Sequence, residues 1–349
     1  MSIKMIERQS FRNQTLYADL LQEAVADTLP AGVGMSFTHK TINDRRYWYL
    51  SVAIGKRRIQ TYLGPDSDEL QEQIKLHREK WSQAEKPLRA RALLVAHLIK
   101  SGATPTPPGV TSILSLLADG GVFLAGGVVI GSIAFAAYAN MLGVQWTHGS
   151  MQTQDIDTAT DHVAVAVQPD GILLEEVLAK SDLKFTPIPA LTPEAPNTGF
   201  SSGPGGIHVD VLTPMRGKES SRPIFLKRLG VHAEPLRFLD YLLEDNQQCV
   251  LLARSGILVH VPSPARYALH KLVVAERRPT TWATKARKDI DQAAQIIQVL
   301  AEDRPGDLIS ALEAAKNYHK KFYQTLEKGM ERLPSLQNIS LSELMELVS

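Results

Sequence analysis

The stretch Gly120–Leu142 contains no charged residue, and its length alone would let a helix cross a bilayer. Glycines interrupt it repeatedly, and neither end carries the Lys or Arg flank that is usual beside membrane helices. The stretch divides instead into an apolar run rich in Val and Ile, Val122–Ile130, the pair Gly131-Ser132, and a helical segment, Ile133–Leu142. It therefore predicts a buried strand, a tight turn and a helix, and not a membrane span.

Three aspartates follow on two segments with strand patterns. Asp155 and Asp157 stand two residues apart, so in a strand their side chains share one face. In Ile207–Leu212 the alternation places His208 and Asp210 on one face. Neighbouring carboxylates repel one another unless a cation lies between them, and Mg²⁺ prefers oxygen ligands. If the two strands are neighbours, the three carboxylates form a site for two metal ions.

The order of these pieces resembles the DNA polymerase β superfamily of nucleotidyltransferases. In that pattern an apolar strand, Gly-Ser, a helix, Asp-x-Asp and a later third Asp follow one another. Here the pieces are Gly131-Ser132, Asp155-Ile156-Asp157 and Asp210. A wider resemblance to bacterial nucleotidyltransferase-fold proteins covers roughly residues 110–300. The interval between the first two pieces is longer than in the smallest members, which implies an inserted loop over Gln145–Met151.

The resemblance implies site residues and a cofactor. Gly131 would let the backbone approach a triphosphate closely, and Ser132 would bind the phosphates at a helix N-terminus. A lysine on a helix after the third aspartate often lies near the phosphates in related proteins, and Lys271 in Pro264–Glu276 matches that position; the alternative is a surface lysine. Two Mg²⁺ or Mn²⁺ ions would be held by the catalytic residues Asp155, Asp157 and Asp210.

Two further features lie near these motifs. Lys285 and Lys288, three residues apart in the predicted helix Trp282–Leu300, could face a triphosphate or RNA. A solvated helix face explains their spacing as well, and we favour that interpretation. The segment Leu183–Gly206 is rich in Pro, Gly, Ser and Thr, which predicts a long loop that covers the site as a lid.

Composition divides the chain into parts of different character. The proline-rich segment Thr104–Gly109 cannot continue a helix, so we expect the catalytic domain to begin there. Before it, Ser67–Trp81 and Lys86–Lys100 predict two charged helices. The expected class is α/β (α+β) with a mixed sheet. The expected parts are a helix-plus-β-meander module, a helical connector, a nucleotidyltransferase domain and a C-terminal helical domain, over residues 1–66, 67–108, 109–262 and 263–349.

Met35–Gly64 predicts three short strands joined by turns at Asn43-Asp44 and Gly55-Lys56. Basic residues are interleaved there with aromatic residues, a composition that can bind phosphates and stack bases. The alternative, which we favour because the segment is short, is a half-buried meander with a solvated basic face. The candidate nucleic-acid contacts are Arg45, Arg46, Trp48, Arg57 and Arg58.

Charge and cysteine content exclude some classes of protein. Lys+Arg 38 against Asp+Glu 37 gives a formal charge of +1, so bulk charge indicates no polyanionic partner. The single cysteine, Cys249, excludes an intramolecular disulfide and a cysteine-based zinc site. Met1–Gln9 carries charges and no apolar run of a signal peptide, so we expect a cytoplasmic protein. The sequence does not indicate an oligomeric state.

These features predict a nucleotidyltransferase that moves NMP from an NTP to a hydroxyl or a phosphate and releases pyrophosphate. The resemblance leaves the acceptor open among RNA or tRNA, protein and small molecules, because several related bacterial proteins are toxins that modify tRNA ends or proteins, or are small-molecule modifiers. Two alternatives stay open: a nucleotidyltransferase fold that binds nucleotide or RNA without turnover, and a nucleic-acid-binding protein that acts through Arg45–Arg58. In a third interpretation the aspartates only form a solvated turn and an edge-strand charge.

Overall fold

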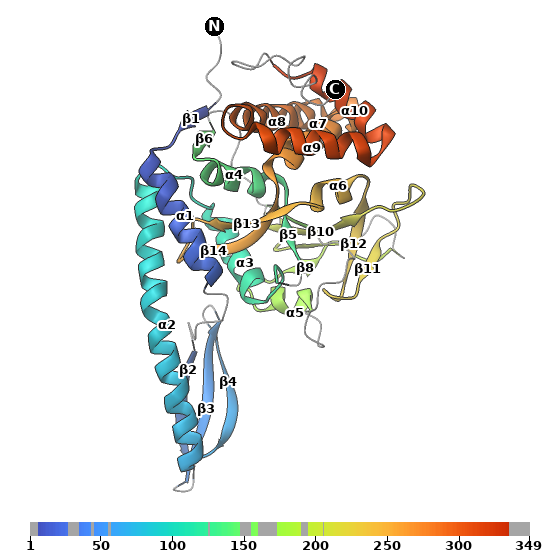
Figure 1. The fold of residues 1–349 in the computed structure, drawn as a ribbon. Helices are drawn as coiled ribbons and strands as arrows, with labels where there is room; N and C mark the ends of the chain where they lie inside the picture. Colours follow the sequence, from blue (N-terminus) through green and yellow to red (C-terminus); the bar gives the residue numbers. More distant parts are fainter. Residues whose placement is uncertain are drawn as a thin grey trace.

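A computed structural model of the chain describes residues 6–26, 35–42, 45–54, 57–124, 126–146, 155–159, 173–189, 195–204 and 206–334. Figure 1 shows a body of sheet and helices and a narrow arm that extends away from it beside a long helix. The body contains a sheet of mixed strand direction with helices packed on it, which confirms the expected α/β class. Among the described residues, no helix is both long enough and apolar enough to cross a membrane.

The main sheet contains seven strands: β5 (Val128–Val129), β7 (Asp155–Ala159), β8 (Thr186–Pro187), β9 (Gly199–Ser201), β10 (His208–Pro214), β11 (Ile224–Leu226) and β12 (Val231–Leu236). Their order is β11-β12-β10-β7-β5, with β9 beside β10 and β8 beside β9. β10 lies parallel to β7 and to β12, whereas β5, β9 and β11 pair antiparallel with their neighbours. The long strand β10 therefore lies at the centre of the sheet.

Two further strand pairs belong to the body. β13 (Asn246–Leu251) and β14 (Ile257–Pro262) form an antiparallel hairpin. The N-terminal strand β1 (Ile6–Arg8) pairs antiparallel with β6 (Val144–Trp146). β1 is therefore tied to the body rather than to the arm.

Helices cover the sheet and gather at one end of the body. Those within the sheet region are α3 (Pro108–Asp119), α4 (Gly131–Met141), α5 (Leu174–Ala179) and α6 (Leu239–Leu243). The C-terminal group, drawn orange to red in Figure 1, consists of α7 (Pro264–Arg277), η1 (Thr280–Trp282), α8 (Ala283–Asp303), α9 (Pro305–Tyr318) and α10 (Lys320–Glu331). One hydrophobic core runs from Ile6 to Met330 and includes residues on both sides of the boundary expected at residue 262.

The arm consists of the antiparallel sheet β2 (Met35–Ile42), β3 (Arg45–Ile54) and β4 (Arg57–Pro65), beside the first part of α2 (Asp68–Lys100). The far part of α2 packs instead against α1 (Phe11–Ala26), where Val95 and Leu98 share a second core cluster with Leu20. α2 is therefore the element that joins the arm to the body.

The predicted strand Val122–Ile130 is wrong for most of its length, because only Val128–Val129 pairs in the sheet. Gly126, inside this stretch, has φ 94°, and Gly121, directly before it, has φ 78°; both values lie outside the range of ordinary strand residues. Val122 and Phe123 are nevertheless buried. The apolar sequence therefore correctly indicated that this stretch is buried, but wrongly indicated that all of it forms a strand.

The two helices predicted before residue 100 are one helix of 33 residues, with Pro87 inside it. Proline removes one hydrogen bond and crowds the preceding turn, which costs about 3 kcal/mol in a helix interior. Both ends of α2 are held independently of that turn. The Ser67 side chain accepts a hydrogen bond from the Leu70 backbone N–H, and Leu98 is buried against the body.

Candidate active site

The directions of three strands bring three sequence motifs to one edge of the main sheet. β5 runs antiparallel to β7, with Val129 opposite Thr158, and the chain enters α4 two residues after Val129. β7 begins at Asp155, and β10 begins beside it in parallel. The carboxyl end of β5 and the amino ends of β7 and β10 therefore meet. Gly131-Ser132 lies at the same edge as the aspartate segments, and α4 contacts β7 directly.

The register of β7 and β10 pairs the aspartate positions. Asp157 is the Cα partner of Asp210, and Asp155 is the partner of His208. This confirms that the two predicted strands are neighbours, and it contradicts a solvated turn for Asp155 and Asp157. Neighbouring strands lie about 4.8 Å apart, so paired positions can share one ligand. The structure describes the backbone of β7 and not its side chains, so the register fixes the positions of Asp155 and Asp157 in the sheet.

The Asp210 carboxylate leans over a glycine of the adjoining strand. Gly199 in β9 is the Cα partner of Asp210, and a Cβ at Gly199 would lie only 2.6 Å from Asp210 Oδ1. The space that the missing side chain leaves is therefore taken by the carboxylate. β9 belongs to the segment Leu183–Gly206, whose described part contains two short strands and so is not a continuous loop.

Gly131 opens α4 with φ 67°, a conformation that favours glycine. Its carbonyl oxygen accepts a hydrogen bond from the Tyr267 hydroxyl of α7 at 2.8 Å. The same hydroxyl lies 3.2 Å from Gln292 Oε1 of α8. Tyr267 is 1% exposed, so α7 and α8 fix the turn before α4 from the buried side.

Ser132 lies in the first turn of α4, and its Oγ accepts a hydrogen bond from Lys288 Nζ at 3.3 Å. Lys288 is partly buried, so the expectation of a solvated face for it is wrong. Lys285 is exposed, and its Nζ lies over the Trp282 ring at 4.6 Å. The two lysines therefore have different surroundings, and Lys288 alone is brought to the Gly131-Ser132 turn by a described contact.

Lys271 of α7 forms an ion pair with Asp289 of α8, with Nζ 2.7 Å from Oδ1. The other oxygen of Asp289 accepts from Arg278 Nε at 2.6 Å, and Asp289 is 3% exposed. Two cations thus share one buried carboxylate. Burial, assisted by the Lys271 charge, lowers the pKa of His270 to about 3 from an ordinary value of 6.5. This histidine is therefore neutral at pH 7.

The arm residues predicted to contact nucleic acid have different surroundings. Arg45 and Arg46 are exposed, and the side chains of Arg57 and Arg58 lie outside the described residues. The Trp48 indole N–H donates to Asp66 Oδ1 at 2.7 Å, and Arg46 lies 3.8 Å from the other oxygen of Asp66. The hydrogen bond from Trp48 has the largest effect in lowering the pKa of the Asp66 carboxyl, and a second hydrogen bond from Gln71 lowers it further. Trp48 is therefore a structural contact within the arm.

Other site features also differ from, or extend, the sequence-based picture. The predicted insertion Gln145–Met151 begins inside β6, and its residues from 147 onward lie outside the described residues. The contacts of Tyr267, Lys288 and Asp289 were not predicted. The buried face of α8, with its regular apolar spacing, includes Asp289, and an acid on such a face indicates a buried cation partner. That signal could have identified the ion pair with Lys271.

Within the side chains that the structure describes, no three His, Cys, Asp or Glu residues form a metal-binding group. The residues that could hold a divalent cation are the register neighbours Asp155, Asp157 and Asp210, whose oxygen donors suit a hard ion such as Mg²⁺. Asp210 also has room for its carboxylate because of Gly199. The donor types and their register therefore fit the metal that the sequence implies.

No curated protein and no solved structure matches the chain. Residues 109–316 match a protein family described as Nucleotidyltransferase. The match spans more than half of the chain and contains the Gly131-Ser132 turn, the three aspartate positions and both α7 and α8. It excludes an account of the protein that rests on the arm alone, since the arm precedes residue 109. The chain belongs to this nucleotidyltransferase family and is a transferase enzyme.

Proposed function

We propose that the protein is a metal-dependent nucleotidyltransferase of the DNA polymerase β superfamily. It would move NMP from an NTP to a hydroxyl or a phosphate of RNA, tRNA or protein and release pyrophosphate. One observation carries the proposal: the register pairs Asp157 with Asp210 at the sheet edge where Gly131-Ser132 opens α4. Phosphate-binding backbone and metal-binding carboxylates belong together in phosphoryl transfer.

In this proposal the triphosphate lies against the first turn of α4. Backbone N–H groups at a helix N-terminus favour anions, and the Ser132 hydroxyl adds one more donor. The contact of Lys288 Nζ with Ser132 Oγ supports a role for Lys288 on the β- and γ-phosphates. Lys271 of α7, whose Nζ lies 5.4 Å from the centre of the Tyr267 ring, is a second candidate for that role. Its ion pair with Asp289 would then hold it in place.

The chemical step would be an in-line displacement. The acceptor oxygen forms a bond to the α-phosphorus, the bond from that phosphorus to the bridging oxygen breaks, and pyrophosphate leaves with the electron pair. Asp210 would accept the proton of an acceptor hydroxyl. Asp155 and Asp157 would hold, with Asp210, two Mg²⁺ or Mn²⁺ ions, which when bound supply charge stabilisation to the attacking and leaving oxygens. The space at Gly199 supports this role, because it keeps the Asp210 carboxylate free of steric conflict.

The test is incubation of the protein with each α-labelled NTP, Mg²⁺ and either total RNA or total protein, with pyrophosphate release measured in parallel. Label should enter one acceptor fraction, and chelation with EDTA should abolish transfer. Asp157→Asn and Asp210→Asn should each abolish it as well. The matched control is Asp291→Asn, because Asp291 is an exposed aspartate of α8. Transfer that persists in Asp210→Asn would exclude this mechanism.

The labelled fraction also identifies the acceptor. Label on tRNA would agree with a toxin-like role, and growth can then be compared between bacteria that express the wild type and those that express Asp210→Asn. Growth arrest by the wild type alone would support that role. Equal growth of both strains, with tRNA labelled in vitro, would instead indicate a housekeeping modification.

A further inference from the structure

The arm sheet has two faces with different contents. Trp48 points to the inner face, where its ring lies 5.7 Å from the guanidinium carbon of Arg78 of α2. Arg78 also donates to the Phe37 carbonyl oxygen at 3.3 Å, and Ile74 of α2 is 3% exposed. The hollow beside Trp48 on this side is lined by the acidic Asp68, Glu72 and Glu79 of α2 together with the basic Lys75 and Arg78. α2 therefore lies beside the inner face, where acidic side chains outnumber basic ones and disfavour phosphates.

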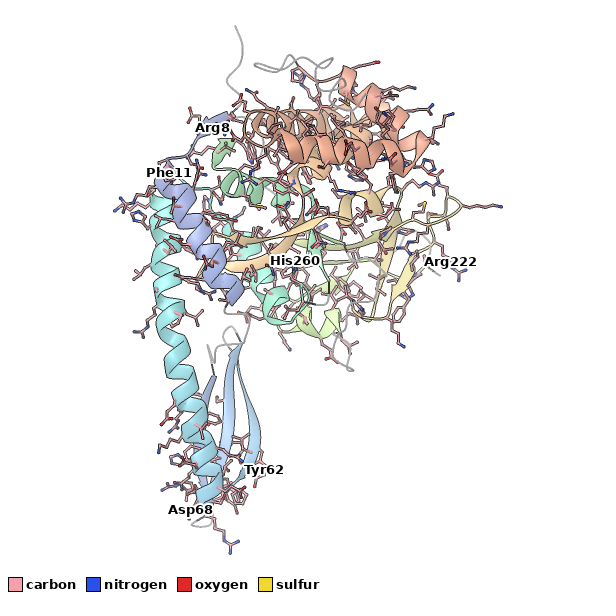
Figure 2. The ribbon with its side chains drawn as sticks, in the orientation of Figure 1. Arg8, Phe11, Tyr62, Asp68, Arg222 and His260 are labelled. Atoms are coloured by element: carbon pink, nitrogen blue, oxygen red, sulfur yellow. The ribbon has the colours of Figure 1, made fainter. Side chains whose placement is uncertain are left out.

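The outer face displays three tyrosines in contact with one another. Tyr49 is the Cα partner of Tyr62, and their ring centroids lie 5.6 Å apart. The Tyr47 and Tyr62 ring centroids lie 6.3 Å apart. The pairing of β3 with β4 shifts register between Trp48 and Tyr49. The contacts of Tyr47 and Tyr49 with Tyr62, and of Trp48 with Arg78, place the tyrosines on the face opposite Trp48. Tyr62 is 54% exposed, and Figure 2 shows it on the arm, away from His260 of the body.

Positive charge accompanies these rings. Lys40 is the Cα partner of Tyr47, and its Nζ lies 4.8 Å from the centre of the Tyr49 ring. Arg45 is exposed and stands two residues before Tyr47, so it belongs to the same face. Residues 35–65 contain six basic residues and one acidic residue, whereas the whole chain has a formal charge of only +1. The arm sheet therefore concentrates positive charge that the rest of the chain lacks.

We propose that this outer face binds single-stranded nucleic acid, with bases stacked on Tyr62 and its neighbours and phosphates against Lys40 and Arg45. Exposed aromatic rings offer each base a flat surface whatever its sequence, and flanking cations follow the backbone. Trp48, which the sequence suggested for this role, is replaced in it by Tyr47, Tyr49 and Tyr62. The inference deepens the proposed function, since it rests on a nucleic acid as the acceptor.

The position of the arm agrees with a long acceptor. α2 contacts the arm sheet at Arg78 and the body cluster at Val95, and the 17 residue steps from one to the other span about 25 Å of helix. The arm sheet is thus separated from the body along α2, so an acceptor held on the outer face and modified in the body has to reach from one to the other. A polymer can do so, whereas a small-molecule acceptor cannot contact both.

The test measures binding without catalysis. Fluorescein-labelled oligouridylate and oligodeoxythymidylate, each about 20 nucleotides so that several bases can stack at once, are titrated with the full chain in the absence of NTP and metal. Tyr62→Ala should weaken binding about 5- to 150-fold, the range for loss of one stacked base. Tyr62→Phe, which keeps the ring, should retain affinity. Lys40→Ala with Arg45→Ala should lower the dependence of affinity on salt, by a slope of about 0.7 per lost phosphate contact.

The matched control is Phe225→Ala, because Phe225 is 53% exposed on the body strand β11 and should leave binding unchanged. Tighter binding of the RNA than of the DNA supports the proposal and identifies RNA as the preferred ligand. Equal binding of both supports a site for single strands of either kind. Absence of binding, equal loss in Phe225→Ala, or tyrosine-dependent binding of a polyglutamate peptide in place of the oligonucleotides would overturn it. Asp210→Asn should bind as the wild type does, so failure of the proposed catalysis stays distinguishable from failure of this site.

Discussion

Lys288 Nζ lies 3.3 Å from Ser132 Oγ, and this contact joins α8 of the C-terminal group to the first turn of α4. A cation is thus held at the helix N-terminus where the proposed triphosphate would lie. An anion there would meet backbone N–H groups, a hydroxyl and an ammonium at once. The C-terminal helices therefore contribute to the candidate active site as well as to the core.

Lys288→Ala should weaken NTP binding by about 1.5–3 kcal/mol, the contribution of a hydrogen bond to a charged group. Ser132→Ala should cost only about 0.5–1.5 kcal/mol, because it removes a neutral donor. Calorimetry with a non-hydrolysable NTP analogue measures both. Lys285→Ala is the control, since Lys285 lies over Trp282 instead. If Lys271→Ala weakens binding and Lys288→Ala does not, the phosphate contact belongs to α7.

Asp289→Asn should destabilise the folded protein by about 3–5 kcal/mol, because it leaves Lys271 and Arg278 partly buried without their shared carboxylate. Urea unfolding followed by circular dichroism measures the free energy of unfolding. Asp291→Asn, at an exposed position of the same helix, should change it by no more than about 0.5 kcal/mol. Equal effects of the two substitutions would show that the ion pairs do not stabilise this junction.

Gly199→Ala should lower the turnover rate on the order of 100-fold, because the new methyl group would displace the Asp210 carboxylate, and a shift of about 1 Å can have that effect. The readout is kcat in the nucleotidyl transfer assay, with thermal unfolding to confirm that the variant folds. In the variant Gly199→Ala/Asp210→Asn the loss should be no greater than in Asp210→Asn alone. Gly306→Ala, where a Cβ meets no atom within 4 Å, should retain full turnover.

Acid should destabilise the protein through His270. Its folded-state pKa is about 3 and its ordinary value is 6.5, so between these pH values the unfolded chain binds the extra proton. This contribution to stability is complete above about pH 6.5 and is lost as the pH falls, at up to about 1.4 kcal/mol per pH unit. Urea unfolding at several pH values measures the slope. His270→Gln should show a shallower slope than the wild type, and identical slopes would contradict the assignment.

The site positions could be predicted from the sequence where the signal is local. The spacing of Asp155 and Asp157 and the alternation around Asp210 predicted two strands, and their neighbouring positions are confirmed by the register. Alternation could also have separated Trp48 from Tyr47 and Tyr49, because successive residues of a strand face opposite ways. Composition alone counts Tyr47, Trp48 and Tyr49 together and does not show that they lie on two different faces of the sheet.

What the sequence did not predict depends on tertiary packing. Lys285 and Lys288 have similar neighbours in the sequence, and only the packing of α8 on α7 and α4 brings one of them to Ser132. The strand expected before Gly131 was too long, since an apolar run does not report the left-handed conformations of Gly121 and Gly126. Ser67–Trp81 and Lys86–Lys100 were expected to form two helices, whereas α2 is one helix with Pro87 inside it, held by contacts at both ends.

Because α2 is one continuous helix, its length fixes how far the arm extends from the body. In a continuous helix each residue adds about 1.5 Å of length and about 100° of rotation, so the number of residues between Arg78 and Val95 sets both the reach and the orientation of the arm. Seven residues make nearly two whole turns, so removing seven would shorten the reach by about 10 Å and keep the orientation, whereas removing two would turn the tyrosine face to another side. If the outer face of the arm binds the acceptor as proposed, the length of this one helix would select which point along the polymer reaches the positions of Asp157 and Asp210.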